Sequence, residues 1–147
     1  MISIQHLKKT YPHVTPLKDV NAEIERGEVI SIIGPSGTGK STLLRCLNLL
    51  EKPTAGAIWV GGDNIMAKGT DIPAVRRKMG MVFQSFNLFS HLMVIENVML
   101  GPVGLLKLSR QEAYDRGMRL LETVGLAEKA LNYPGELSGG QKQRVAI

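Results

Sequence analysis

One short glycine-rich segment constrains the fold of this chain more than any other feature. The apolar run Val29–Ile33 leads directly into Gly34-Pro35-Ser36-Gly37-Thr38-Gly39-Lys40-Ser41, and apolar residues at helical spacing follow. A short run rich in β-branched residues is typical of a strand buried on both faces. A strand, a glycine-rich turn and a helix in this order indicate an α/β architecture with a parallel sheet.

The residue types of this segment suit the binding of nucleotide phosphates. Their spacing fits G-x-x-x-x-G-K-[ST] without deviation. Glycines let backbone N–H groups turn toward phosphate oxygens, and the helix that begins near Lys40 presents its positive dipole end to them. Lys40 would supply a mobile positive charge and Ser41 a hydroxyl for Mg²⁺. The alternative is a glycine-rich turn without function, and the flanking strand and helix argue against it.

Composition and charge exclude several classes of protein. Of the 147 residues, 44% are hydrophobic and 21% are charged, which is the balance of a globular domain. The longest apolar stretch, Val98–Leu106, is much shorter than the roughly 20 residues of a membrane-spanning helix. The N-terminus has no basic start before an apolar run, so we expect no signal peptide. The net charge of +5 is scattered and aromatic residues make up only 5%, so we expect no nucleic-acid partner.

The first part of the chain has the pattern of a mixed α/β domain. The alternating apolar residues of 2–4 and 20–24 predict antiparallel strands, and 57–60 and 81–83 predict two more strands. Asp71 and Pro73 predict a short helix that ends at Gly80. Cys46 lies between leucines of the helix after the glycine-rich loop, where we expect a small core residue.

The chain changes character after Phe83 and becomes helical. One helix is predicted from Val94 to a stop at Gly101-Pro102. A second begins at the capping box Ser109-x-x-Glu112 and ends at Gly125. The sequence therefore predicts two parts: residues 1–84, the first part of a nucleotide-binding core, and residues 85–147, a helical subdomain.

A second glycine cluster, Leu137-Ser138-Gly139-Gly140-Gln141, begins the last helical stretch, which is expected to reach Ile147. Ser138 and Gln141 have the spacing of a capping box, which is a purely structural role. A hydroxyl and two bare glycine amides at a helix start would equally suit an anion. The residues alone leave both interpretations open.

The glycine-rich loop and the LSGGQ segment together resemble the ATP-binding subunits of ABC transporters, over almost the whole chain. This resemblance implies an α/β P-loop ATPase core with an N-terminal antiparallel β part and a helical subdomain, here truncated. The stretches LLRCLNLLEKPTAG, MGMVFQSFNLFSHLMVIENV and YPGELSGGQKQRVAI are most similar to importers of polar amino acids.

The resemblance also implies ATP and Mg²⁺ as cofactors, with specific residues in contact with them. Tyr11 would stack on adenine, Lys40 and Gln84 would take part in catalysis, and Ser41 and Gln84 would contact the metal. Tyr11 could instead be an ordinary turn aromatic, and Gln84 a surface residue at a strand end. The nucleotide-binding residues implied are Tyr11, Gly34, Pro35, Ser36, Gly37, Thr38, Gly39, Lys40, Ser41, Thr42, Ser138, Gly139, Gly140 and Gln141.

The partners implied by the resemblance are those of an import system. A second ATP-binding subunit would form a head-to-tail dimer in which Ser138 and Gly140 of one subunit cover ATP on the other. The segment around Gln84 would face membrane permease subunits, and a solute-binding protein would act indirectly. The chain would then be a peripheral protein on the cytoplasmic face of the cell membrane.

The family continues beyond LSGGQ into a strand that ends in Asp-Glu and then a switch histidine. We therefore expect this chain to be the N-terminal part of a longer ATPase that binds ATP better than it hydrolyses it. Leu92–Glu96 has four apolar residues and then an acid, but Asn97–Met99 continue the apolar face at helical spacing, so it is not that strand. Two alternatives are a nucleotide-binding fragment without turnover, and a soluble ABC ATPase acting on nucleic acid or ribosomes.

Overall fold

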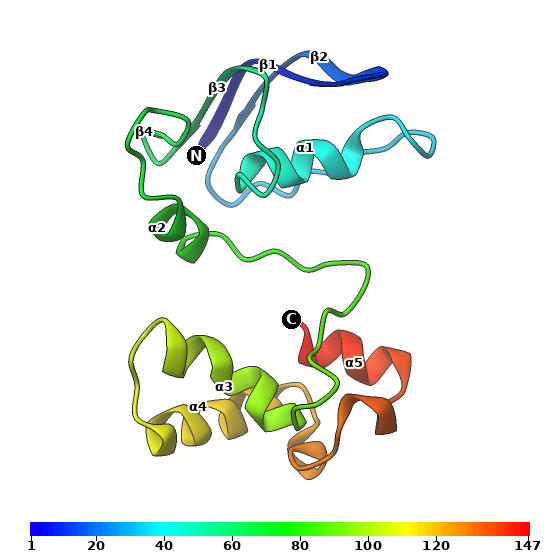
Figure 1. Cartoon of the computed structure of the whole chain (residues 1–147), viewed down its shortest axis with the longest axis vertical. Coiled ribbons are helices and arrows are strands. Elements are labelled where there is room, and N and C mark those ends of the chain that lie inside the picture. The colour runs from blue at the N-terminus through cyan, green and yellow to red at the C-terminus, as the bar shows by residue number, and fades with distance from the viewer. The chain divides into compact units, whose positions relative to one another are not determined.

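The computed structural model describes all residues from 1 to 147 and divides them into two compact units, Met1–Gly80 and Met81–Ile147. The first unit contains a four-stranded sheet and two α-helices, and the second is entirely helical (Figure 1). Each unit has a hydrophobic core of its own.

The sheet of the first unit is antiparallel and has the strand order β2-β1-β3-β4. Strand β1 (Ile2–Tyr11) pairs with β2 (Val14–Ile24) on one side and β3 (Ala55–Val60) on the other, and β4 (Asp63–Asn64) pairs with β3. Ile4 of β1 stands opposite Ala22 and Ile58, so its side chain enters the core. The antiparallel strands over 2–4 and 20–24 and the strand over 57–60 predicted from the sequence are confirmed.

A bulge in β1 interrupts the simple alternation of that strand. Between Ile4 and Leu7 the chain advances three residues while β2 advances two, and the extra residue, His6, has φ 48°. The His6 N–H donates to Asn21 Oδ1 at 2.8 Å. Both Ile4 and Leu7 are thereby buried. Gly56 of β3 lies beside the bulge, where a Cβ would be only 2.5 Å from the carbonyl oxygen of His6, so no larger residue fits.

Two helices complete the first unit. Helix α1 (Lys40–Leu47) lies beside the sheet (Figure 1) and buries Cys46 among Ile4, Leu7 and Leu17, as predicted. Helix α2 (Ile72–Arg77) begins at Asp71, whose Oδ1 accepts the N–H of Ala74 at 3.1 Å, and this start also agrees with the prediction. The guanidinium of Arg76 donates to the carbonyls of residues 48 and 49 and so ties α2 to the end of α1.

Two strands expected from the sequence are absent from the structure. Residues 29–33 and 81–83 belong to no strand, and Val29 and Ile33 are 94% and 92% exposed. A β-strand is stabilised by hydrogen bonds to the neighbouring strands of a sheet, and neither stretch belongs to the sheet β2-β1-β3-β4. A β-branched run alone is therefore insufficient, and the prediction of strands at these two places was wrong for this structure.

The second unit consists of three α-helices and two short 3₁₀ helices. They are α3 (Val94–Gly104), α4 (Arg110–Thr123), η1 (Ala127–Lys129), η2 (Pro134–Glu136) and α5 (Gly139–Val145). Helices α3 and α4 pack side by side (Figure 1), and the bare Cα of Gly117 faces Ile95, where a Cβ would lie 2.7 Å from Ile95 Cδ1. The longest helix has 14 residues, and none of the helices has the length and apolar character needed to cross a membrane.

The helix boundaries of the second unit match the sequence where capping fixes them. Ser109 and Glu112 form the predicted capping box, and Leu92–Glu96 leads into a helix, as expected. The predicted stop at Gly101-Pro102 is wrong, because α3 continues through Pro102 to Gly104. A proline removes only its own N–H, and the next turn still bonds normally, with Leu105 N–H donating to Gly101 O at 2.8 Å. Helix α5 ends at Val145, two residues before the predicted end.

Candidate nucleotide-binding site

The predicted phosphate loop, Gly34–Ser41, turns directly into helix α1. Gly37 and Gly39 have φ values of 83° and 97°, a left-handed backbone that glycine adopts without strain. Gly39 is the N-cap of α1, and no side chain accepts a hydrogen bond from the first turn. The backbone N–H groups at this helix start therefore lack side-chain acceptors and lie where the helix dipole favours an anion.

The side chain of Lys40 contacts the beginning of the loop that precedes it. Its ammonium donates to the carbonyl oxygens of Gly34 and Pro35, both at 2.7 Å, and the Thr38 hydroxyl donates to Pro35 O at 3.0 Å. No carboxylate forms an ion pair with Lys40. The charge of Lys40 is thus satisfied only by neutral carbonyls, which phosphate oxygens could replace with a stronger, charge-assisted contact.

The start of α1 is fixed against the hairpin of the sheet. A Cβ on Gly39 would lie 3.0 Å from both Cβ and O of Pro16 and 3.3 Å from Leu17 Cδ2, both residues of β2. A Cβ at this position would push Pro16 and Leu17 away by a few tenths of an ångström, so the bare Cα favours this close approach. At Gly37, by contrast, a Cβ would meet nothing within 4 Å, so the tip of the loop is open to a ligand.

These features fit a nucleotide triphosphate with its Mg²⁺. The loop provides left-handed glycine backbone, a helix start without a side-chain cap, one ammonium group and open space at Gly37. Ser41, in the first turn of α1, is exposed and carries the hydroxyl that could serve as a magnesium ligand, and Thr42 follows it. The donor set is oxygen-based, as magnesium prefers.

Tyr11 ends strand β1 and stands opposite Val14 at the tip of the hairpin. Its ring lies under the ammonium of Lys9, which is 4.8 Å from the ring centroid. The same ammonium is 2.7 Å from Glu51 Oε1. The hydrogen bond from Lys9 is the main cause that holds the pKa of Glu51 below its ordinary value, and a hydrogen bond from Tyr11 acts in the same direction. Sequence reasoning did not find this three-residue cluster, since Lys9 and Glu51 are far apart in the chain.

Ser138–Gln141 form the capping box that the sequence predicted. Ser138 Oγ accepts the N–H of Gln141 at 3.3 Å, and Gln141 Oε1 accepts the N–H of Ser138 at 2.8 Å. The glycines between them are not demanded by the fold. Neither has a positive φ, a Cβ on Gly140 would meet nothing within 4 Å, and one on Gly139 would only touch the Phe86 ring at 3.9 Å. The fold therefore does not require glycine at these two positions, and their backbone is accessible to a ligand.

Gln84 lies in a bend of the second unit, and the LSGGQ residues Gly139 and Gly140 begin α5 in the same unit. All three residues are exposed. The phosphate loop and Tyr11 belong to the first unit. The structure therefore brings together Gly34–Thr42 and the hairpin end, and it brings Phe86 beside Gly139. A common role of Gln84 and the phosphate loop remains a prediction from the sequence.

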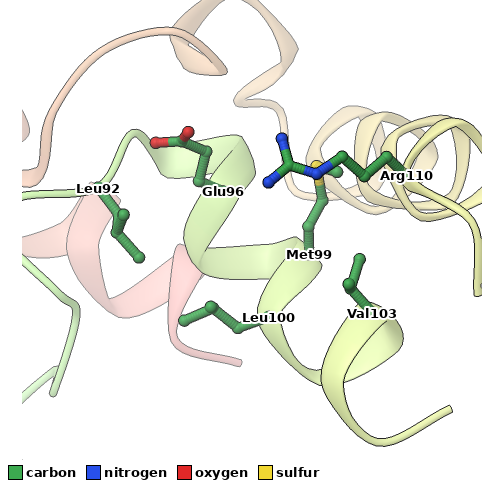
Figure 2. Close-up of a pocket in the computed structure, with 6 residues that line it drawn as sticks. All are labelled: Leu92, Glu96, Met99, Leu100, Val103 and Arg110. Atoms are coloured by element: carbon green, nitrogen blue, oxygen red, sulfur yellow. The ribbon is translucent and has the colours of Figure 1, made fainter. Parts of the chain in front are cut away.

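A hollow of about 160 Å³ lies on the second unit between α3 and α4. Figure 2 shows the six residues that line it, two of which are charged: Glu96 near the start of α3 and Arg110 at the start of α4. The Glu96 carboxylate accepts the N–H of Met93 at 2.8 Å and so caps α3. The apolar residues of the hollow are Leu92, Met99, Leu100 and Val103. The sequence had not singled out this feature, because it combines residues of two helices.

The family of this chain follows from comparison with known proteins. Residues 17–147 match the model of a protein family that is described as "ABC transporter". The chain belongs to the ABC transporter family. This cassette is 50% identical, over its full length, to the glutamine transport ATP-binding protein GlnQ of Bacillus subtilis and also to the arginine transport ATP-binding protein ArtM of the same organism. It is 46% identical to the glutamate/aspartate import ATP-binding protein GltL of Escherichia coli.

The cassette spans 61% of the length of these relatives. Among solved structures, it matches a dimeric bacterial ABC transporter cassette with a TM-score of 0.89 and 39% identity, covering 100% of this chain and 67% of that one. It also matches a second dimeric structure of the same protein, in a post-hydrolysis state bound to ADP and Pi, with a TM-score of 0.88 and 38% identity over 99% of this chain and 67% of that one. The α/β ABC ATPase fold inferred from the sequence is confirmed.

Proposed function

We propose that this cassette binds ATP with Mg²⁺ at Gly34–Ser41, as the ATP-binding part of an importer of polar amino acids. The observation that carries the proposal is the loop geometry: left-handed glycines, an uncapped helix start and an ammonium held only by carbonyls. The relatives support the class of solute, since their names specify glutamine, arginine, glutamate and aspartate transport.

The residues of the loop, together with Tyr11 and Gln84, would each contact a different part of the bound nucleotide and metal. Backbone N–H groups of Gly37–Thr42 would bind phosphate oxygens, and Lys40 would exchange the carbonyls of Gly34 and Pro35 for the outer phosphates. Ser41 would hold Mg²⁺, which neutralises phosphate charge when bound. Tyr11 would stack on the adenine ring. Gln84 would contact the metal and the water that attacks the phosphate.

The test is calorimetric titration of the chain with ATP and Mg²⁺. The variant Lys40→Ala should weaken binding about ten- to a hundredfold, because a hydrogen bond from a charged group to phosphate is lost. Lys68→Ala is the matched control, since it removes the same charge from an exposed lysine outside the loop. Equal affinity in wild type and Lys40→Ala would refute the assignment.

Binding and turnover should separate in this chain. The loop acts on bound phosphates, whereas hydrolysis also needs a carboxylate for the metal and a base for water. No carboxylate forms an ion pair with Lys40 of the loop. A missing general base costs about 10²- to 10⁴-fold in rate. We therefore expect ATP binding with negligible phosphate release. Release at the rate of a complete relative such as GlnQ would contradict this and would direct attention to Glu96.

The proposed partners are a second cassette and permease subunits, at the cytoplasmic face of the membrane, with a solute-binding protein acting indirectly. The bare glycines Gly139 and Gly140 leave room for ATP held by a second copy, and one solved relative is dimeric in two structures. The largely exposed segment 84–90 and the α3–α4 hollow would face the permease. No observation favours a soluble ATPase acting on nucleic acid or ribosomes.

The permease contact can be tested in the complete transporter. Phe89 is 53% exposed within this segment, so Phe89→Glu should uncouple ATP hydrolysis from transport while ATP binding stays unchanged. Leu131→Glu is the control, because Leu131 is similarly exposed but lies after η1. If segment 84–90 cross-links only to soluble proteins, the transporter assignment is wrong.

A further inference from the structure

Three side chains meet at the end of the sheet where β1 finishes. The Lys9 ammonium lies over the Tyr11 ring at 4.8 Å from its centroid and 2.7 Å from Glu51 Oε1. It also donates to the carbonyl oxygen of Lys52 at 2.8 Å. Lys9 and Tyr11 share one face of β1 because they are two residues apart. These contacts define the Lys9–Glu51–Tyr11 cluster.

Lys9 is held firmly for a lysine. Its side chain is only 12% exposed, and two oxygens from residues 51 and 52 fix its ammonium. The segment that provides these oxygens is itself anchored to the sheet, since Thr54 N–H donates to Lys8 O at 2.8 Å and Thr54 Oγ1 accepts from Thr10 N–H at 2.9 Å. The cation is therefore a fixed part of the surface behind the tyrosine ring.

We propose that Lys9 is a positioning residue for nucleotide binding: it covers one face of the Tyr11 ring and fixes the ring so that only the opposite face receives the base. This inference rests on the proposed function, in which Tyr11 stacks on adenine. A cation on one face is attracted by the electron-rich ring. It also draws electron density from the opposite face, which reduces repulsion between the ring and a stacked base.

The cluster lies at the same end of the first unit as the phosphate loop. Lys9 stands opposite Leu17 in the sheet, and Tyr11 opposite Val14. Leu17 and the neighbouring Pro16 are the residues against which Gly39 packs at the start of α1. One hairpin therefore supports the loop through β2 and the aromatic ring through β1. A ligand with phosphates at one end and an aromatic base at the other matches this pairing.

Two ligands separate this role from a general effect on the fold: ATP, which has a base, and inorganic tripolyphosphate, which has none. Both are titrated into wild type, Tyr11→Ala, Lys9→Met, Lys9→Arg and the double variant Lys9→Met/Glu51→Gln. The double variant retains an acceptor for Tyr11 while leaving no unpaired carboxylate. Melting temperatures verify that each variant is folded.

Tyr11→Ala should weaken ATP binding about five- to a hundredfold. Lys9→Met and the double variant should each weaken it about three- to tenfold, with unchanged affinity for tripolyphosphate. Lys9→Arg should restore most of the ATP affinity, and Lys9→Met should have no further effect once Tyr11 is alanine.

Unchanged ATP affinity in Lys9→Met and in the double variant would overturn the positioning role. An equal loss of ATP and tripolyphosphate affinity would also overturn it, since Lys9 would then act on the loop or the fold. If wild type binds tripolyphosphate but Tyr11→Ala has no effect on ATP, the base platform is wrong while the phosphate site stands. If wild type binds neither ligand, the proposed function itself fails.

Discussion

At the scale of single residues, Gly37 and Gly39 of the phosphate loop are required for different physical reasons. Gly37 needs a left-handed backbone but has open space around it, whereas Gly39 needs both the backbone and the missing Cβ. These two requirements can be separated by experiment, because alanine imposes backbone strain at both positions and a steric clash at only one.

We expect Gly37→Ala to lower stability by about 1–2 kcal/mol through the left-handed backbone alone. Gly39→Ala should cost more, since its Cβ would lie 3.0 Å from Pro16 O and Cβ, and α1 would have to move away from β2. Thermal unfolding of both variants gives the comparison. Equal losses at the two positions would mean that the contact with Pro16 carries no energy.

A second residue-scale prediction concerns Glu112, whose carboxylate accepts the Ser109 hydroxyl at 2.6 Å and the Ser109 N–H at 2.9 Å. These bonds, the side-chain one first, lower the pKa of Glu112 from 4.5. A lowered folded pKa stabilises the native state above the unfolded value and loses that effect as pH falls through the folded value. Acid should therefore weaken helix α4.

Helical circular dichroism during denaturant titrations between pH 6 and about pH 2 tests this cap. The decline in stability of wild type as pH falls should be smaller in Glu112→Gln. Glu122→Gln removes the same charge from the last turn of α4, away from the cap, and should keep the wild-type slope. The cap makes no contribution if both variants have the same slope.

At the scale of elements, helices α3 and α4 come close where Ile95 Cδ1 faces Gly117, and the substitution Ile95→Val removes that atom. Gly117→Ala gains about 1 kcal/mol in helix propensity but places a Cβ 2.7 Å from Ile95 Cδ1. In an Ile95→Val background that atom is absent. We expect Gly117→Ala to be neutral or destabilising alone and stabilising by about 1 kcal/mol after Ile95→Val.

Thermal denaturation of the four members of this cycle measures the coupling between the two positions. Gly101→Ala in α3 is the control, because a Cβ there meets nothing within 4 Å. Its effect on stability should be the same with and without the Ile95→Val substitution. Additive effects of Gly117→Ala and Ile95→Val would show that the two helices adjust freely.

Elements whose stability is local were predicted well from the sequence. The capping boxes at Ser109 and Ser138 and the N-cap at Asp71 depend on residues three apart, and all are present. Elements that depend on distant partners were not: the run 29–33 has the pattern of a strand but pairs with nothing. Likewise the phosphate loop could be found as a motif, whereas the contact of Lys9 with Glu51 could not.

At the scale of the whole molecule, the unpaired run 29–33 is the segment most prone to associate with another chain. Val29 and Ile33 are more than nine-tenths exposed, in an apolar segment that belongs to no helix or strand. Such a segment offers free hydrogen-bonding groups to another chain. We expect self-association through two copies of this run, which Val29→Lys/Ile33→Lys should suppress without loss of stability, since neither side chain is packed.

Sedimentation velocity over a range of concentrations measures this self-association. Leu131→Lys is the control, because Leu131 is 67% exposed but lies in a turn after η1. It should leave the association unchanged. A monomeric wild type, or equal effects of the two changes, would exclude pairing through residues 29–33.

The division into two units also has a consequence for the order of folding. Most contacts of the helical unit join residues that are close in sequence. Its longer-range hydrogen bonds, such as Val94 N–H to Asn132 O at 2.9 Å, also join residues of this unit. The sheet unit must join Ile2 to Val60 before β3 can pair. Chains fold faster when contacts are local. In pulse-labelled hydrogen exchange, amides of α3 and α4 should therefore become protected first. The phosphate loop packs against Pro16 and Leu17 of β2, so this contact should form only in a later, slower phase.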